Sequence, residues 1–232
     1  MKRYPFSIII PALNEAASIQ HCLLALQPLR NHAEIIVVDG GSCDNTIELA
    51  TLYADKVLSS EQGRARQMNQ GAKQATGDIL VFLHADTELS EQALSLIEQA
   101  ISTQQIWGRF DIQLRGESIM FTVIAFMMNW RSRLTGIATG DQVLFVSQTA
   151  FNAVGGYPEI SLMEDIALSR ALKKISSPIC LTAKVNSSAR RWQQYGIYKT
   201  ILLMWSLRLR YWLGADPLYL AELYRTGLLW KR

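Results

Sequence analysis

Short apolar runs alternate with longer periodic segments in the first half of the chain. Three runs have the length and composition of buried strands, because each is rich in Ile, Val, Leu or Phe and stops at a polar or small residue: residues 6–10, 34–38 and 78–83. Four segments have the spacing of helices: residues 15–26, 45–54, 64–75 and 90–102. Alternation of this kind predicts an α/β fold with a mainly parallel central sheet covered by helices on both faces.

The pattern changes after Trp107. A strand at 107–114 is followed by an apolar helix from near Ser118, a polar connection with Gly136 and Gly140, a short strand at 143–146 and a helix near 163–174. With 232 residues and no internal repeat, we expect a single domain over residues 1–232. Its expected parts are a nucleotide-binding half at 1–106, an acceptor and catalytic half at 107–189 and a helical C-terminal segment at 190–232.

Composition narrows the class of protein. With 49% hydrophobic and 19% charged residues, the chain has the make-up of a folded domain rather than a disordered one. A net charge of +3 is far from the basic surface of a nucleic-acid-binding protein. We therefore expect no nucleic-acid partner.

The expected location is cytoplasmic. Cys22, Cys43 and Cys180 are odd in number and widely spaced, which favours a reducing compartment. The apolar run at residues 6–10 is too short for a secretory signal, and none reaches the ~20 residues of a membrane-spanning helix. The apolar-rich stretch at 197–213 carries basic and aromatic residues, but Arg208 breaks its helical face. A core helix is therefore preferred, and peripheral contact with the inner face of the membrane stays open.

Ligands of open parallel sheets bind beyond the carboxyl ends of the strands, so the residues after each apolar run are the candidates. Pro11, Asn14 and Glu15 follow the first run, and Asn14 and Glu15 would equally suit the start of a helix. Asp39 ends the second run before two glycines. This arrangement suits recognition of a nucleoside, or simply a tight turn with a capped helix.

Further acids lie later in the chain. Asp86 follows the third run in the sequence His84-Ala-Asp86, and a carboxylate there suits Mg²⁺ or Mn²⁺ as well as a helix cap. Glu164 and Asp165 open a helix, where adjacent acids are usually surface residues. Arg190, Arg191 and Trp192 form a candidate anion clamp, with a solvated basic turn as the simpler interpretation.

Five segments in this order resemble the family 2 glycosyltransferases of the GT-A fold: SIIIPALNE at 7–15, EIIVVDGGS at 34–42, GRARQMN at 63–69, ATGDILVFLHAD at 75–86, and GGYP at 155–158 with Glu164–Asp165. Four shorter segments look like a bacterial subgroup associated with radical-SAM and selenium-domain proteins: RSRLTG at 131–136, GDQ at 140–142, LMED at 162–165 and SARRW at 188–192. The resemblance covers almost the whole chain.

This resemblance implies a hexosyltransferase that uses a nucleotide-diphosphate sugar, a hydroxyl acceptor and a divalent metal, Mg²⁺ or Mn²⁺. It implies the donor-nucleotide site: Pro11, Asn14, Glu15, Asp39, Arg64, Arg66 and His84. Asp86 would be the metal ligand and Asp165 the general base, with Glu164 beside it. Asp141, Gln142, Arg191 and Trp192 would meet the diphosphate or the acceptor.

The chain departs from the family pattern at two positions, because His84 replaces the first acid of the Asp-x-Asp signature and Gly40 replaces the second acid of the usual Asp-Asp-Gly-Ser turn. The predicted reaction is a transfer with inversion at the anomeric carbon. Two alternatives stay open: a nucleotide-sugar-binding protein with reduced catalysis, and a nucleotidyltransferase. A homodimer packed through the apolar surface of 115–142 is also open.

Overall fold

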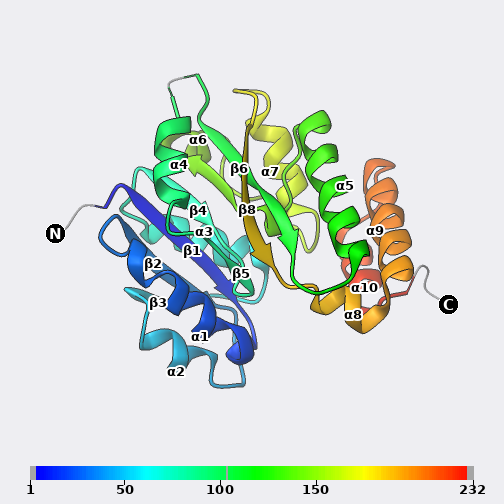
Figure 1. Ribbon diagram of the computed structural model, residues 1–232, viewed down its shortest axis with the longest axis horizontal. Coiled ribbons are helices and arrows are strands. Elements are labelled where there is room, and N and C mark those ends of the chain that lie inside the picture. The colour runs from blue at the N-terminus through cyan, green and yellow to red at the C-terminus, as the bar shows by residue number, and fades with distance from the viewer. Residues whose placement is uncertain (1–3, 103, 229–232) are drawn as a thin grey trace.

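The computed structural model describes residues 4–102 and 104–228, and these form a curled sheet with helices on both faces (Figure 1). The sheet has eight strands in the order β3-β2-β1-β4-β7-β6-β8-β5. Their bounds are β1 Phe6–Ala12, β2 Ala33–Asp39, β3 Lys56–Ser59, β4 Ile79–Phe82, β5 Thr87–Glu88, β6 Trp107–Leu114, β7 Leu144–Ser147 and β8 Ile179–Ser187. The predicted α/β architecture is confirmed.

The first four strands form the parallel part of the sheet. β1 pairs in parallel with β2 and β4, and β2 pairs in parallel with β3. Ile8 and Ile10 face one core and Ile9 faces the other, and all three are fully buried. Because both faces are covered, the strand is a continuous apolar run rather than an alternating one.

The second half of the sheet is mixed. β7 is antiparallel to both β4 and β6, β6 is parallel to β8, and the short β5 is antiparallel to β8 at the edge. The carboxyl end of β4 therefore lies beside the amino end of β7, so the sheet changes direction next to the segment that follows β4.

The helices divide between the two faces. Their bounds are α1 Ala16–Ala25, α2 Thr46–Thr51, α3 Arg64–Gln74, α4 Ala93–Ala100, α5 Ile119–Thr135, α6 Gln148–Ala153, α7 Glu164–Leu172, α8 Arg190–Tyr195, α9 Ile197–Trp212 and α10 Pro217–Thr226. Apolar residues of α1, α2 and α4 pack on one face of the sheet, and those of α3, α6 and α7 pack on the other. α9 and α10 pack against the start of α7 and form a separate apolar cluster.

The helix α5 is fastened to β6 by polar groups. Asn129 exchanges two hydrogen bonds with the backbone of Ile112, at 2.9 and 3.0 Å. Arg109, which is fully buried, donates to Ser132 Oγ at 3.1 Å and pairs with Asp111. Several polar side chains of α5 therefore point toward the sheet.

The predicted strands and helices are present with shifted ends. The sequence patterns missed β3, β5, β8 and α6, since the missed strands are short or, like β8, mix exposed polar with buried apolar residues. Helix α10 lies within the predicted helical segment at 190–232. Residues 229–232 of the predicted C-terminal segment lie outside the described residues. Within 4–102 and 104–228, none of the helices has both the length and the apolar content needed to cross a bilayer.

Candidate active site

A cavity of about 990 Å³ lies beyond the carboxyl ends of β1 and β4. The loop after β1, the start of α3 and the segment after β4 form one side. Helices α5, α8, α9 and α10 form the other, and the start of α7 and the turn at 139–141 lie between them. Of the predicted site residues, those that line the cavity are Pro11, Asn14, Glu15, Arg64, His84, Asp86, Asp141, Glu164, Asp165, Arg191 and Trp192. The fold thus gathers residues from positions 11 to 192.

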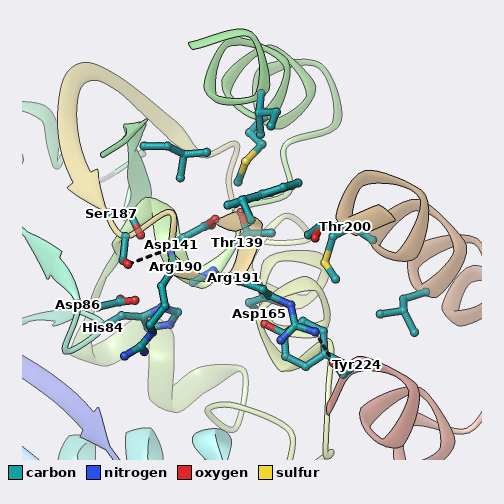
Figure 2. A pocket seen from close by; sticks show the side chains of 18 of the residues that line it. His84, Asp86, Thr139, Asp141, Asp165, Ser187, Arg190, Arg191, Thr200 and Tyr224 are labelled. Carbon is teal, nitrogen blue, oxygen red and sulfur yellow. Dashed lines mark hydrogen bonds between the residues drawn. The ribbon is translucent and has the colours of Figure 1, made fainter. Parts of the chain in front are cut away.

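Asp165 has a fixed orientation at the start of α7. One of its carboxylate oxygens accepts a hydrogen bond from the backbone N–H of Gly140 at 3.0 Å, and the other accepts from the N–H of Ile166 at 2.7 Å. Met163, which precedes the helix, has a left-handed backbone with φ of 71°. These contacts hold the carboxylate at the wall of the cavity (Figure 2).

Gly140 connects Asp165 with His84. A Cβ at position 140 would lie 2.5 Å from Nε2 of His84, so no larger residue fits there unless the imidazole moves. Because the same residue donates its N–H to Asp165, the turn sets the distance between the two side chains. The sequence placed Gly140 in a polar connection without indicating this packing.

His84 is held as a neutral imidazole. Burial lowers its pKa to about 3, and the nearby Arg64 lowers it in the same direction. The residue that replaces the first acid of the signature therefore brings no charge at neutral pH. It leaves Asp86 as the carboxylate of this segment.

The environment of Asp86 suits a cation. Burial raises the pKa of its carboxyl group, the negative charge of Glu15 raises it further, and Arg190 and Arg64 oppose the shift. Burial likewise raises the pKa of Glu164, and Asp165 adds to the effect. A positive ligand near Asp86 would relieve the repulsion between these acids.

The residues around Asp86 fit a divalent metal that binds together with a phosphorylated ligand. Among the described residues, no group of three or more His, Cys, Asp or Glu side chains is placed to hold a metal ion. Mg²⁺ and Mn²⁺ do not require such a cage, because they bind through one or two carboxylates together with substrate phosphates. Asp86 fits that mode of binding, in which the metal arrives with a phosphorylated ligand.

Three predicted residues do not line the cavity. Asp39 is buried, and its carboxylate accepts hydrogen bonds from the N–H groups of Gly41 and Ser42, at 2.8 and 2.9 Å. Arg66 forms ion pairs with Glu61 and Glu159 at the surface.

Gln142 is fully buried and bonds to the turn residue Thr139. The carboxylate of Asp39 accepts three hydrogen bonds, one from Gly41 and two from Ser42, as the interpretation of Asp39 as part of a tight turn expects.

Sequence patterns missed several cationic and aromatic residues of the cavity: Arg131, Arg208, Tyr195 and Tyr224. Arg208 was visible only as the residue that broke the basic face of the predicted helix. That break is explained by the structure, since Arg208 lines the cavity while Lys199 is exposed.

Arg131 and Arg208 lie near each other and near two acids. Burial lowers the pKa of Arg131 to about 10, with a further lowering by Arg208, and Asp141 and Asp165 oppose the change. Burial raises the pKa of Asp141. Among the described residues, Nη2 of Arg131 and Oδ1 of Asp141 are buried without a hydrogen-bond partner. Such groups normally find a partner, so they are available to a ligand.

Arg191 lines the helical side of the cavity and packs against Tyr224 of α10. Its guanidinium lies 3.5 Å from the centre of the Tyr224 ring and donates to the backbone carbonyl of the same residue (Figure 2). Its Nε is buried without a partner among the described residues. Arg191 of the predicted anion clamp is therefore held by α10, which lies within the predicted helical segment at 190–232.

Comparison with known proteins gives a consistent result. The sequence model described as glycosyl transferase family 2 matches residues 7–149. A relative from Mycobacterium bovis (strain BCG / Pasteur 1173P2), the PGL/p-HBAD biosynthesis glycosyltransferase, is 41% identical over 95 residues, which cover 37% of each chain. The chain thus matches little more than a third of that relative's length.

Solved structures share the fold. The mannosyltransferase PcManGT from Pyrobaculum calidifontis, in complex with GDP-Man and Mn²⁺, superposes with a TM-score of 0.66 at 19% identity, over 90% of this chain and 63% of the other. TarS 1-349 from S. aureus, in complex with UDP-GlcNAc, also gives a TM-score of 0.66, at 17% identity, over 88% of this chain and 66% of the other. The GT-A fold expected from the sequence is confirmed.

Proposed function

The chain belongs to glycosyl transferase family 2, and from this premise we propose that it transfers a sugar from a nucleotide-diphosphate donor to an acceptor hydroxyl. One observation carries the proposal. Asp165, oriented by the N–H of Gly140, shares a cavity with Asp86 and Arg64, which lie where a charged diphosphate would be placed. A base and a diphosphate site facing one space are what such a transfer requires.

The donor nucleotide is proposed to bind along the strand ends. Pro11, Asn14 and Glu15 line this side of the cavity. Asn14 is held in place because its side-chain oxygen accepts from the N–H of Cys43, and its own N–H donates to Ser42, both at 2.8 Å. In this proposal Asp39 supports the donor site by shaping the loop at 39–42.

Asp86 is the proposed ligand of the divalent metal. When bound, Mg²⁺ or Mn²⁺ would offset the charge that develops on the diphosphate as it leaves. Arg64 and Arg191 line the same cavity and would donate hydrogen bonds to phosphate oxygens. The mannosyltransferase and TarS structures were obtained with GDP-Man and UDP-GlcNAc, which supports a donor of this chemical class.

Asp165 is the proposed general base. It accepts the proton of the acceptor hydroxyl while that oxygen forms a bond to the anomeric carbon, and the bond from that carbon to the diphosphate oxygen breaks. Attack opposite the leaving group inverts the configuration. Glu164 is the poorer candidate because its side chain is buried and lies 3.9 Å from the guanidinium of Arg64.

The remaining predictions are narrower. A division into a donor half at 1–106, a catalytic half at 107–189 and a helical segment at 190–232 is part of the proposal, and it is supported by Arg64 and Asp86 lining the cavity from the first part and Asp165 from the second. Cytoplasmic location, contact with the inner face of a membrane, a homodimer and the radical-SAM-associated subgroup stay predictions from the sequence.

The experiment is a panel of nucleotide-diphosphate sugars incubated with the protein and Mn²⁺. Release of free sugar and a nucleoside diphosphate by slow hydrolysis supports a glycosyltransferase. With pyrophosphate added, its consumption to form a nucleoside triphosphate and a sugar 1-phosphate would favour the nucleotidyltransferase, and donor binding without any turnover would favour the binding protein. Asp165→Asn serves as the matched control, because water, like an acceptor, loses its proton to the base.

A further inference from the structure

The outer face of α5 is apolar although it faces solvent. Five of its large apolar residues are 45–81% exposed and recur at intervals of three or four residues: Ile119, Val123, Phe126, Trp130 and Leu134. This spacing places them on one side of the helix. Asn129 and Ser132, by contrast, are buried toward the sheet. An apolar stripe of this length is not what a helix surface exposes without a binding role.

The helix α9 repeats the arrangement. Its exposed large residues also recur at intervals of three or four, with 55–73% exposure: Tyr198, Leu202, Trp205, Leu209 and Trp212. The two helices are neighbours, because Ile197 and Ile201 of α9 pack against the buried cluster of α5. Their exposed residues together form a broad apolar surface over two helices that lie side by side, green and orange in Figure 1.

This surface is continuous with the active-site cavity. The cavity wall includes methionines from both helices: Met120, Met127 and Met128 from α5 and Met204 from α9. Val123 and Trp205 both line the cavity and are exposed, at 45% and 66%. The cavity therefore opens between α5 and α9 through an apolar mouth, and methionine side chains adapt readily to flexible apolar ligands.

A polar group marks the inner end of this path. Arg131, one turn beyond Met127 on α5, lines the cavity with an unpartnered Nη2. Asp165 also lines this cavity, and its negative charge raises the pKa of Arg131. A ligand that runs from the mouth to Asp165 thus meets apolar side chains first and a hydrogen-bond donor at its head.

We propose that the acceptor is an amphiphile, with a hydroxyl-bearing polar head at Asp165 and Arg131 and an apolar chain that leaves the cavity between α5 and α9. This inference rests on the proposed function, since it names the acceptor class of the same site. The strand-end side is allotted to the charged donor, so the apolar mouth is the way out for the rest of the acceptor. A chain longer than the cavity continues over the exposed stripes.

Binding can be tested without turnover. 11-Bromo-1-undecanol, whose bromine quenches indole fluorescence on contact, is titrated into the protein and compared with 3-bromo-1-propanol. We expect saturable quenching at concentrations at least about 100-fold lower for the longer alcohol, because each buried methylene contributes to affinity. Trp205→Asp should weaken binding at least about 10-fold. Leu52→Asp, at a residue that is 67% exposed on the far helical layer, should bind as the unaltered protein does.

Equal quenching by the two alcohols, or equal affinities of Trp205→Asp and Leu52→Asp, would overturn the proposal. A dimer that Trp205→Asp dissociates, without any effect of chain length on alcohol binding, would also overturn it in favour of a second copy of this chain. Binding to phosphatidylcholine vesicles without binding of the free alcohol would overturn it in favour of a membrane-contact surface.

Transfer separates this inference from the function on which it rests. With a donor from the panel, formation of the alkyl glycoside is measured for primary alcohols from ethanol to decanol. We expect the second-order rate constant to rise about threefold per methylene until the chain fills the cavity, and Trp205→Asp to flatten the rise. If the donor is hydrolysed but the rate of glycoside formation does not depend on the chain length of the alcohol, the amphiphilic acceptor is contradicted and the transferase is not. If the long-chain alcohol binds but no donor is turned over, the transferase is contradicted and the amphiphile-binding site is not.

Discussion

On the strand-end side of the cavity, loop residues hold one another through specific hydrogen bonds, whereas on the helical side polar groups lack partners and apolar side chains reach solvent. The carboxylate of Asp39 accepts hydrogen bonds from the N–H groups of Gly41 and Ser42, and Oγ of Ser42 accepts from the N–H of Asn14. Across the cavity, Arg131 and Arg191 each retain an unpartnered nitrogen among the described residues, and Phe126 and Trp205 are 63% and 66% exposed.

This difference matches a division of labour. The strand-end loops and α5 lie within the segment matched by the family 2 model, residues 7–149, while the other helices of the helical side, α8, α9 and α10, lie outside it. A preorganised polar surface suits a ligand that all members of the class share, namely a nucleoside diphosphate. An apolar surface with free hydrogen-bond donors suits a partner that differs between members, which in our account is the acceptor.

The largest expected effect comes from the residue between the two sides. Asp165→Asn keeps the size of the side chain and removes its capacity to accept a proton, so kcat should fall about 10²- to 10⁴-fold. Donor affinity, measured by calorimetry, should change little because the nucleotide binds along the strand ends. Retention of normal turnover would show that another group is the base.

A smaller effect is expected at the strand-end side itself. Asp86→Ala should weaken Mn²⁺-dependent donor binding about 10- to 100-fold, and affinity measured with EDTA present should be nearly the same as in the unaltered protein. The control is Glu91→Ala, which removes an exposed acid that follows β5 in the chain. If both variants lost the same affinity, the assignment of Asp86 to the metal would fail.

The neutral imidazole of His84 predicts a pH effect on folding. Its pKa is about 3 in the folded protein and about 6.5 in the unfolded chain. Below pH 6.5 the unfolded chain therefore binds a proton that the folded protein does not, so stability is lost as the pH falls toward 3.

At pH 5 the loss attributable to His84 is about 2 kcal/mol relative to neutral pH. Urea titrations of the unaltered protein and His84→Gln should differ in their pH dependence by this amount. Identical pH dependence in the two proteins would mean that His84 has the same pKa in the folded protein as in the unfolded chain.

The smallest effect is expected on the helical side. Phe126→Ala, at an exposed position of α5, should change the free energy of unfolding by less than about 0.5 kcal/mol. Phe121→Ala, one and a half turns earlier and 5% exposed, should cost about 3–5 kcal/mol. A large cost for Phe126→Ala would mean that the stripe packs inside the fold rather than serving a ligand.

The sequence predicted the strand-end side better than the helical side. Apolar runs such as 6–10 stop at the cavity, so the residues after them were found directly. Distances across the fold are not visible in such runs. The contact of Gly140 with His84 joins residues 56 positions apart, and Arg191 is held by Tyr224, so neither could be read from local spacing.

Asp39 and Arg208 illustrate the same limit in opposite directions. Asp39 has the composition of a ligand site, and its carboxylate is bonded within its own turn, so its contact with the donor stays a prediction. Arg208 looked like a defect in a helical face, and it lines the cavity because α9 packs with that side inward. For both residues, the hydrogen bonds and packing in the fold show contacts that the residue type alone does not reveal.

The most direct test of the account is a crystal structure of the Asp165→Asn protein with an intact nucleotide-diphosphate sugar and Mn²⁺. The account predicts the diphosphate beside Asp86 and Arg64, with the anomeric carbon facing the side chain at position 165 and the α5–α9 mouth left free for the acceptor. A donor lying along α5 and α9, or a diphosphate remote from Asp86, would contradict it.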